Sequence, residues 1–360
     1  RSHFGSRVGL AQVQLPARHR TSLHERMMAP SDVLEPADAQ GEAIPKQSHS
    51  SDGLPVSFSL DIFKEFDVSS VVAEPVAPVD SHFATYGGRC ILLRNVLTTE
   101  ECAYLIKEMG GEMAPVNYRH DYRRNDRAVY ESSELAELLW RRVEPSARGL
   151  ILCAETDAAR QRLLSDGAEG SEPQGQADCP EELRLGYGQE GVWHPIGLNE
   201  CLRFCRYTPG GFFRAHCDAR FQRSEDEQSL FTCMFYLDGA MEGGATRFLH
   251  FDADVPHLQA AREDQVLASV EPRAGQCLLF FQPGLLHEGA ELLAGEKHIL
   301  RTEVMFRRDL ATKPQLLPHQ AEALALLRQA QEAEESGQCD RAASLYRRAF
   351  KMDPRLEFVC

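Results

Sequence analysis

Long hydrophobic runs are missing from this 360-residue sequence. No stretch approaches the roughly 18 consecutive apolar residues that a membrane-spanning helix needs, and the opening RSHFGSRVGL lacks the apolar segment of a signal peptide. We therefore expect no membrane association and a cytoplasmic or nuclear location. Because the sequence does not begin with methionine, a targeting segment upstream stays open.

An excess of basic residues is also missing. The sequence has 39 Lys and Arg against 54 Asp and Glu, a formal charge of -15, and no basic stripe stands out. Such a chain repels a phosphate backbone, so we expect no nucleic-acid partner. The 11 cysteines include no CxxC pair, and Cys201 and Cys205 are interpreted as small core residues of a strand, which favours a reducing compartment.

Apolar periodicity divides the chain into segments. Residues 1–55 mix Pro, Ser, Gly and charge without periodicity and predict a disordered tail, and the polar, glycine-rich residues 155–180 predict an insertion loop. Two amphipathic helices are predicted between these segments, after the short strand GGRCILLRNV. LTTEECAYLIKEMGG starts with a capping box of Thr98 and Glu101, and SSELAELLWRRVEP starts with a serine cap and places Pro145 beyond its last turn.

Strand signals dominate residues 198–308. Six short apolar segments are bounded by Gly, Pro or Asp: LRFCRYTP, GFFRAHCD, LFTCMFYLDG, ATRFLHFD, QCLLFFQPG and HILRTEVMF. Because no long helix separates them, they predict an antiparallel sandwich or barrel rather than a doubly wound sheet. The expected fold class is α+β, mainly β.

Residues 315–356 predict a helical hairpin whose two Ala- and Leu-rich helices meet at Gly337. Residues Gly337, Ala342, Tyr346, Ala349 and Pro354 have the spacing of a tetratricopeptide repeat. One such repeat buries too little apolar surface to stand alone, so it must dock on the barrel, bind a protein partner or continue into further repeats. We favour a hairpin that caps the domain.

His216 and Asp218 suggest a metal site. In a strand, alternate side chains share a face, so these two project together and supply two-thirds of the 2-His-1-carboxylate arrangement that binds non-haem Fe(II). A second histidine must come from another strand, and His287 follows the apolar segment QCLLFFQ. His250 and Asp252 have the same spacing and form a competing pair.

The order of motifs RY, PG, HxD, YL, EGGxTxF, LLFF, LLHEG and GxK closely resembles the catalytic domain of Fe(II)- and 2-oxoglutarate-dependent dioxygenases of the prolyl 4-hydroxylase type. The resemblance covers residues 85–308, including NDR at 125–127. It implies a double-stranded β-helix (jelly-roll) core over residues 80–310, with supporting helices before it. It also implies Fe(II), the cosubstrate 2-oxoglutarate and L-ascorbate.

Carried over by position, the resemblance makes His216, Asp218 and His287 the iron ligands and gives His250 and Asp252 no role. It makes Lys297 the partner of the distal carboxylate of 2-oxoglutarate. Three further residues are expected near the cosubstrate: Arg301 as an alternative or additional clamp, Tyr207 as a phenol that hydrogen-bonds the cosubstrate, and Arg203 on the same face as a contact of cosubstrate or substrate.

Other residues near these motifs have two interpretations each. Gly243 and Gly244 are expected to form a tight turn, and Thr246 to be structural. Trp193 either covers the cosubstrate or packs in the core. A polar loop containing Arg124, Asn125 and Arg127 either flanks a substrate groove or is simply solvated.

The resemblance implies a procollagen-proline 4-dioxygenase-like enzyme that hydroxylates a prolyl or other residue of a protein substrate and releases succinate and CO2. Two alternatives stay open. The same chemistry acts on a small molecule, or the barrel is catalytically idle and serves with the helical unit as a protein-interaction module.

Overall fold

The computed structural model describes residues 53–63, 66–76, 90–150, 152–154, 189–250, 255, 258–282, 285–313, 315–354 and 356. The predicted insertion loop at 155–180 lies outside these residues, as does the predicted tail up to residue 52. The end of that tail is not disordered as predicted, because β1 (Leu54–Pro55) pairs in parallel with β6 (Asp126–Glu131). An edge strand with free backbone groups can recruit such a segment although the segment has no apolar pattern.

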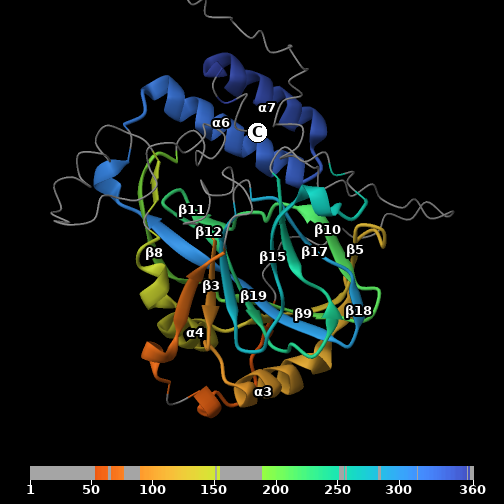
Figure 1. The fold of residues 1–360 in the computed structure, drawn as a ribbon. Helices are drawn as coiled ribbons and strands as arrows, with labels where there is room; N and C mark the ends of the chain where they lie inside the picture. The colour runs from red at the N-terminus through yellow and green to blue at the C-terminus, as the bar shows by residue number, and fades with distance from the viewer. Residues whose placement is uncertain are drawn as a thin grey trace, which may run out of the picture.

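A large, almost wholly antiparallel sheet forms one wall of the molecule (Figure 1). After β1 and β6, its order continues through β9 (Cys201–Tyr207), β19 (Lys297–Arg308), β12 (Glu227–Tyr236), β16 (Cys277–Phe281), β3 (Cys90–Arg94) and β2 (Val72–Pro75). Three further strands pair with members of this series: β4 (Ala114–Pro115), β8 (Gly191–Leu198) and β11 (Gln222–Ser224). A fourth, β7 (Leu152–Ala154), pairs with β8.

A smaller sheet faces the large one. Its order is β15 (Val266–Val270), β14 (Thr246–Leu249), β17 (His287–Gly289), β10 (Phe212–His216) and β5 (Arg123–Arg124). A separate pair joins β13 (Glu242–Gly243) to β18 (Leu292–Ala294). Both larger sheets contribute to one buried core, in which Phe231, Phe248 and Phe280 are at most 1% exposed. The fold is therefore the mainly β jelly roll that the sequence predicts.

Each of the six predicted strand segments contains an observed strand, but the sequence pattern misses β8, β15 and β17. β8 contains Pro195 and two glycines, which are poor strand formers. β17 has only three residues, and its backbone is held in place by β10 and β14 on either side. These segments form strands because neighbouring strands pair with their backbones, and not because of their local propensity.

Helices α3 (Thr99–Met109) and α4 (Ser133–Ala147) lie at the opposite end of the barrel from the C-terminal helices (Figure 1). The capping box of Thr98 and Glu101 and the serine cap at Ser132 are both confirmed. The prediction that Pro145 lies beyond the helix is wrong, because α4 continues to Ala147. Proline removes a single backbone hydrogen bond near the helix end, and the bond from Arg148 N–H to the Glu144 carbonyl closes the last turn.

The C-terminal hairpin consists of α6 (Pro318–Glu335) and α7 (Cys339–Met352), with Gly337 at a φ of 72° between them. Its buried residues form an apolar cluster separate from the barrel core. Ion pairs link it and its connecting segment to the β11–β12 turn, where Glu225 contacts Arg328 and Lys313. No helix among the described residues is long and apolar enough to cross a membrane.

Five 3-10 helices complete the described elements: η1 (Asp61–Phe63), η2 (Val68–Ser70), η3 (Gly110–Glu112), η5 (Glu263–Gln265) and η6 (Leu310–Thr312).

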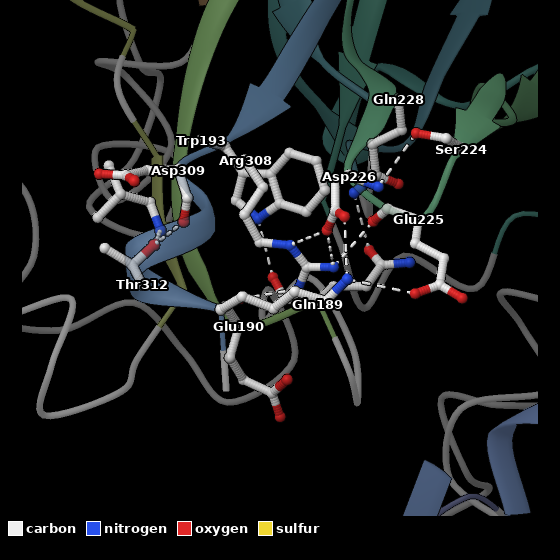
Figure 2. Close-up of polar contacts among 12 residues, drawn as sticks. Gln189, Glu190, Trp193, Ser224, Glu225, Asp226, Gln228, Arg308, Asp309 and Thr312 are labelled. Carbon is white, nitrogen blue, oxygen red and sulfur yellow. Dashed lines mark hydrogen bonds and ion pairs between the residues drawn. The ribbon is translucent and has the colours of Figure 1, made fainter. Parts of the chain in front are cut away.

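Arg308 ties the end of β19 to the start of β8 and to the β11–β12 turn (Figure 2). Its guanidinium donates to the Asp226 carboxylate at 2.8 Å, to the Glu190 carbonyl at 3.0 Å and to the Glu225 carbonyl at 2.8 Å. It also lies 4.9 Å from the centre of a ring of Trp193, which is fully buried. Trp193 therefore packs against Arg308 and does not line the pocket described below, which is the second of its two interpretations.

Candidate metal centre and cosubstrate pocket

His216 and His287 lie directly opposite each other on neighbouring strands. They are Cα partners in the antiparallel pairing of β10 with β17, so their side chains share one face of the smaller sheet. Asp218 follows two residues after His216. Its carboxylate oxygens lie 3.6 Å from Nε2 of His216 and 3.7 Å from Nε2 of His287. The structure thus brings the three predicted ligands together.

Backbone carbonyls orient both imidazoles. Nδ1 of His216 lies 2.7 Å from the carbonyl of Arg214, and Nδ1 of His287 lies 2.9 Å from the carbonyl of Leu285. A carbonyl only accepts, so each Nδ1 carries the proton and each Nε2 lone pair is left for a metal. Burial, followed by the repulsion of His216, lowers the pKa of His287 to about 3, which keeps this ring neutral.

Asp218 is held from two sides. The hydroxyl of Thr232 donates to its Oδ2 at 2.6 Å, and the Arg301 guanidinium lies 2.8 Å from its Oδ1. Burial disfavours the charged carboxylate, but the Arg301 guanidinium holds the pKa of Asp218 well below its usual value. Two neutral imidazoles and one ionised carboxylate on a single face are the donor set of a non-haem Fe(II) centre, so these residues fit that metal. In the described part of the chain no other such cluster is found.

Apolar rings surround the two histidines. Phe213 stacks on His216 with ring centres 3.6 Å apart, and Phe280 meets His287 edge-on at 4.7 Å. His287 is 5% exposed and Asp218 is 8% exposed. Low exposure limits exchange with bulk water and strengthens the electrostatic interactions inside the site.

Lys297 lies in the same pocket as the three candidate ligands, but on β19 of the opposite sheet. Its ammonium donates to the carbonyl of Gly244 at 2.5 Å and lies 5.2 Å from the centre of the Tyr207 ring. It forms no ion pair with any carboxylate among the described residues. Burial lowers the pKa of Lys297 to about 8, opposed chiefly by Asp238.

Tyr207 and Arg301 also line this pocket, whereas Arg203 does not. Arg203 instead forms an ion pair with the buried Glu303 at 2.6 Å. Burial raises the pKa of Tyr207 to about 12, against the lowering effect of the Arg123 guanidinium, which also hydrogen-bonds the phenol. Arg203 therefore lies outside the lining of the pocket, with its charge paired by Glu303.

The remaining predicted residues differ in outcome. Gly243 and Gly244 have φ of 76° and 75° and form the expected turn. Thr246 accepts a hydrogen bond from the Tyr236 hydroxyl at 2.7 Å, in keeping with a structural role, and it also borders the pocket. His250 is not part of the metal cluster, and Asp252 lies outside the described residues.

The prediction of a polar loop over residues 124–127 is wrong. Arg124 ends β5 and Arg127 belongs to β6, while Asn125 between them is buried and accepts a hydrogen bond from Arg123 at 2.7 Å. Strong charge conceals these strands from a search for apolar alternation, but their backbones are paired by β10 and β9.

Two pocket residues are missed by the sequence pattern. Thr232 is an ordinary β-branched residue of a buried strand, and nothing in its neighbourhood signals that it contacts Asp218. Arg123 precedes the NDR motif and lines the pocket with a side chain only 6% exposed. The alternation of Arg123, Asn125 and Arg127 is the one signal that could have indicated a shared face.

Comparisons with known proteins agree with this site. Residues 202–302 match the model of the 2OG-Fe(II) oxygenase superfamily. The chain is 23% identical over 256 residues to probable prolyl 4-hydroxylase 6 of Arabidopsis thaliana, a match covering 67% of this chain and 77% of that protein.

Solved structures with some likeness include a Pseudomonas putida prolyl-4-hydroxylase, at 20% identity and a TM-score of 0.36, covering 63% of this chain and 96% of that one. Another is the viral collagen prolyl hydroxylase of Paramecium Bursaria Chlorella virus-1, at 18% identity and a TM-score of 0.33, covering 61% and 96%.

The matched segment contains His216, Asp218, His287 and Lys297. The chain therefore carries a 2OG-Fe(II) oxygenase domain with a prolyl 4-hydroxylase among its homologues. It is a 2-oxoglutarate-dependent dioxygenase, and the family implies Fe(II) and 2-oxoglutarate.

Proposed function

We propose that this protein hydroxylates a C–H bond of a prolyl or other residue in a protein substrate, converting 2-oxoglutarate to succinate and CO2. The observation that carries the proposal is the buried cluster of His216, Asp218 and His287 facing an uncompensated lysine in one pocket. We assign the catalytic domain to residues 80–310 and the helical hairpin to residues 315–356.

His216, Asp218 and His287 would hold Fe(II), and when bound the metal and 2-oxoglutarate supply the oxidising chemistry. The protein's part is to keep both Nδ1 protons on backbone carbonyls and both Nε2 atoms toward the metal. Thr232 and Arg301 fix the rotamer of Asp218. Phe213 and Phe280 exclude water from the two imidazoles. L-ascorbate belongs to the same proposal as an external reductant.

Of the two candidate clamps, Lys297 suits the distal carboxylate of 2-oxoglutarate better than Arg301. A carboxylate withdrawn from water needs a charged partner, and Lys297 is buried without an ion pair to any described carboxylate. Arg301 already contacts Asp218 at 2.8 Å. We therefore assign Lys297, with the Tyr207 phenol beside it, to the distal carboxylate, and Arg301 to the support of Asp218.

Succinate formation from 2-oxoglutarate under oxygen, with a proline-containing peptide mixture as substrate, tests the proposal. We expect His216→Ala and Asp218→Ala to abolish turnover and to remove the visible absorption of bound Co(II). His250→Ala is the matched control, because it removes a histidine of the competing pair that lies outside the cluster.

Unchanged turnover in His216→Ala and Asp218→Ala would refute the assigned ligands. Turnover with free metabolites but not with any peptide would show that the same chemistry acts on a small molecule. Partner binding that is indifferent to metal and cosubstrate, without turnover of any substrate, would favour the idle interaction module.

A further inference from the structure

Arg123 lines the pocket and Arg127 approaches it along the neighbouring strands, and within the described ranges neither forms an ion pair with a carboxylate. Strand register places Arg127 on the pocket side, because it pairs with Cys205 of β9, which in turn pairs with Ile299 of β19. Directly paired residues on neighbouring strands share a face, and both Cys205 and Ile299 line the pocket. Arg127 therefore belongs to a row that leads into the site, with Ala114 of β4 as its partner on the other side.

Arg123 reaches the same region from the opposite sheet. Its Nε donates to Asn125 Oδ1 at 2.7 Å, and its Nη2 lies 3.8 Å from the sulfur of Cys205, a weak acceptor. These contacts and the Tyr207 phenol leave the positive charge uncompensated, although the residue is only 6% exposed.

Aromatic rings fix the position of Arg123 relative to the metal centre. Its guanidinium carbon lies 4.2 Å from the centre of the Phe213 ring, and His216 stacks on that ring at 3.6 Å. Two groups that close to one ring must occupy its two faces. The guanidinium is therefore one ring away from a candidate metal ligand. Tyr118, which is 49% exposed, lies 5.6 Å from Arg123 on the way to solvent.

The other cations in and beside the pocket have identified partners. Arg203 pairs with Glu303, and Arg301 pairs with Asp218. The distal carboxylate of 2-oxoglutarate would neutralise Lys297. Within the described ranges, Arg123 and Arg127 form no ion pair. Burial lowers the pKa of Arg127, and the Arg123 guanidinium lowers it further, so the two charges repel each other.

A buried Arg123 beside a half-buried Arg127 is costly unless a counter-ion joins them, and this protein is otherwise strongly acidic. We propose that Arg123 and Arg127 bind a carboxylate of the substrate, and that this carboxylate is an Asp or Glu side chain close to the hydroxylated residue. The inference rests on the proposed function and specifies its substrate as an acidic peptide. A guanidinium pair suits a carboxylate because each offers parallel N–H donors to its two oxygens.

The test is a binding measurement that needs no turnover. Fluorescent peptides with a central proline carry Glu or Gln at each flanking position in turn, and the protein is loaded with Mn(II) and N-oxalylglycine. We expect one Glu position to bind about ten- to a hundredfold more tightly than its Gln counterpart, the range for a charge-assisted hydrogen bond. Arg123→Met and Arg127→Met should each remove that preference.

Arg206→Met is the matched control. Arg206 lies on β9 next to Tyr207 but on the other face, and it already pairs with Asp126 at 2.7 Å. It should keep the Glu preference. Thermal unfolding of the ligand-free variants checks folding, and Arg127→Met should be at least as stable as the wild type because it relieves repulsion with Arg123.

Equal binding of Glu and Gln peptides at every position would overturn the proposal, and so would a Glu preference that survives in folded Arg127→Met. A third contrary result is tight binding of a small free acid such as N-acetyl-proline, but not of its amide or of any peptide. The last would assign the arginines to a small carboxylate. Failure of succinate formation concerns the proposed function instead, since these binding measurements do not depend on it.

Discussion

At the residue scale, the site is defined by which charges have partners. Asp218 accepts a hydrogen bond from Thr232 and forms an ion pair with Arg301, so it remains ionised although buried. Lys297 has a carbonyl and an aromatic face but no carboxylate in the part of the chain that is described. A buried ammonium without a counter-ion loses its proton more easily. This imbalance supports the proposed role of Lys297 as the partner of the distal carboxylate.

The lowered pKa of Lys297 predicts a pH dependence of cosubstrate binding. Binding needs the ammonium, so affinity for 2-oxoglutarate should fall above pH 8, by up to about tenfold per pH unit. Calorimetric titration of the Mn(II)-loaded protein from pH 7 to 9 measures this. Lys297→Arg, whose guanidinium stays charged, should bind with a flat profile over the same range.

The same group affects stability with the opposite sign. The pKa of Lys297 is about 8 in the folded state and 10.5 in its reference state, so between these values the unfolded chain binds more protons. The ligand-free wild type should therefore gain stability relative to Lys297→Met as pH rises through that window. A constant difference, or a cosubstrate affinity independent of pH in the wild type, would contradict the assignment.

At the element scale, a buried ion pair joins the two supporting helices. Arg142 of α4 donates to both carboxylate oxygens of Glu101 in α3, at 2.7 and 2.6 Å, and to the carbonyl of Val96 at 2.9 Å. Both side chains are at most 4% exposed. Glu101 is also the third helical residue of the capping box. One carboxylate thus starts α3 and holds α4 against it.

Arg142→Met should lower the free energy of unfolding by about 3–5 kcal/mol, since it leaves a buried carboxylate without its partner. Its neighbour Arg141 provides the matched control, because Arg141 pairs with Glu137 on the exposed face of the same helix. Arg141→Met should cost less than about 0.5 kcal/mol. Urea unfolding followed by circular dichroism measures both, and equal effects would show that the buried pair has no special role.

At the scale of the whole molecule, two apolar cores share one chain. The barrel core includes α3 and α4, whereas α6 and α7 bury a smaller cluster of their own. Glu225 of the barrel forms ion pairs with Arg328 of α6 and with Lys313 of the connecting segment, and these side chains are 33–48% exposed. Such pairs contribute little to stability. The hairpin should therefore unfold locally before the barrel does.

Ala349→Glu tests this separation, because it forces a charge into the hairpin cluster at a fully buried position. Hydrogen exchange should show lost protection over residues 318–352, with protection in β9, β10 and β17 unchanged. Ala343→Glu, on the exposed face of the same helix, is the control and should leave the hairpin protected. Parallel loss in the barrel strands would show that the two cores unfold as one.

Local spacing in the sequence was sufficient to predict many of the strands and helix caps of this protein. The capping box at Thr98, the strand pattern from 198 to 308 and the common face of His216 and Asp218 all depend on neighbours within a few residues, where backbone geometry fixes direction. The ordered motifs also placed His287 and Lys297 correctly in one pocket.

Tertiary structure decided everything that depends on which strand lies beside which. Register made His287 the direct partner of His216, assigned Thr232 and Arg301 to Asp218, paired Arg203 with Glu303 and left Arg123 and Arg127 without an ion pair in the described part of the chain. It also packed Trp193 against Arg308, away from the pocket. These outcomes follow from contacts between residues as far as 115 positions apart, and no local pattern encodes such distances.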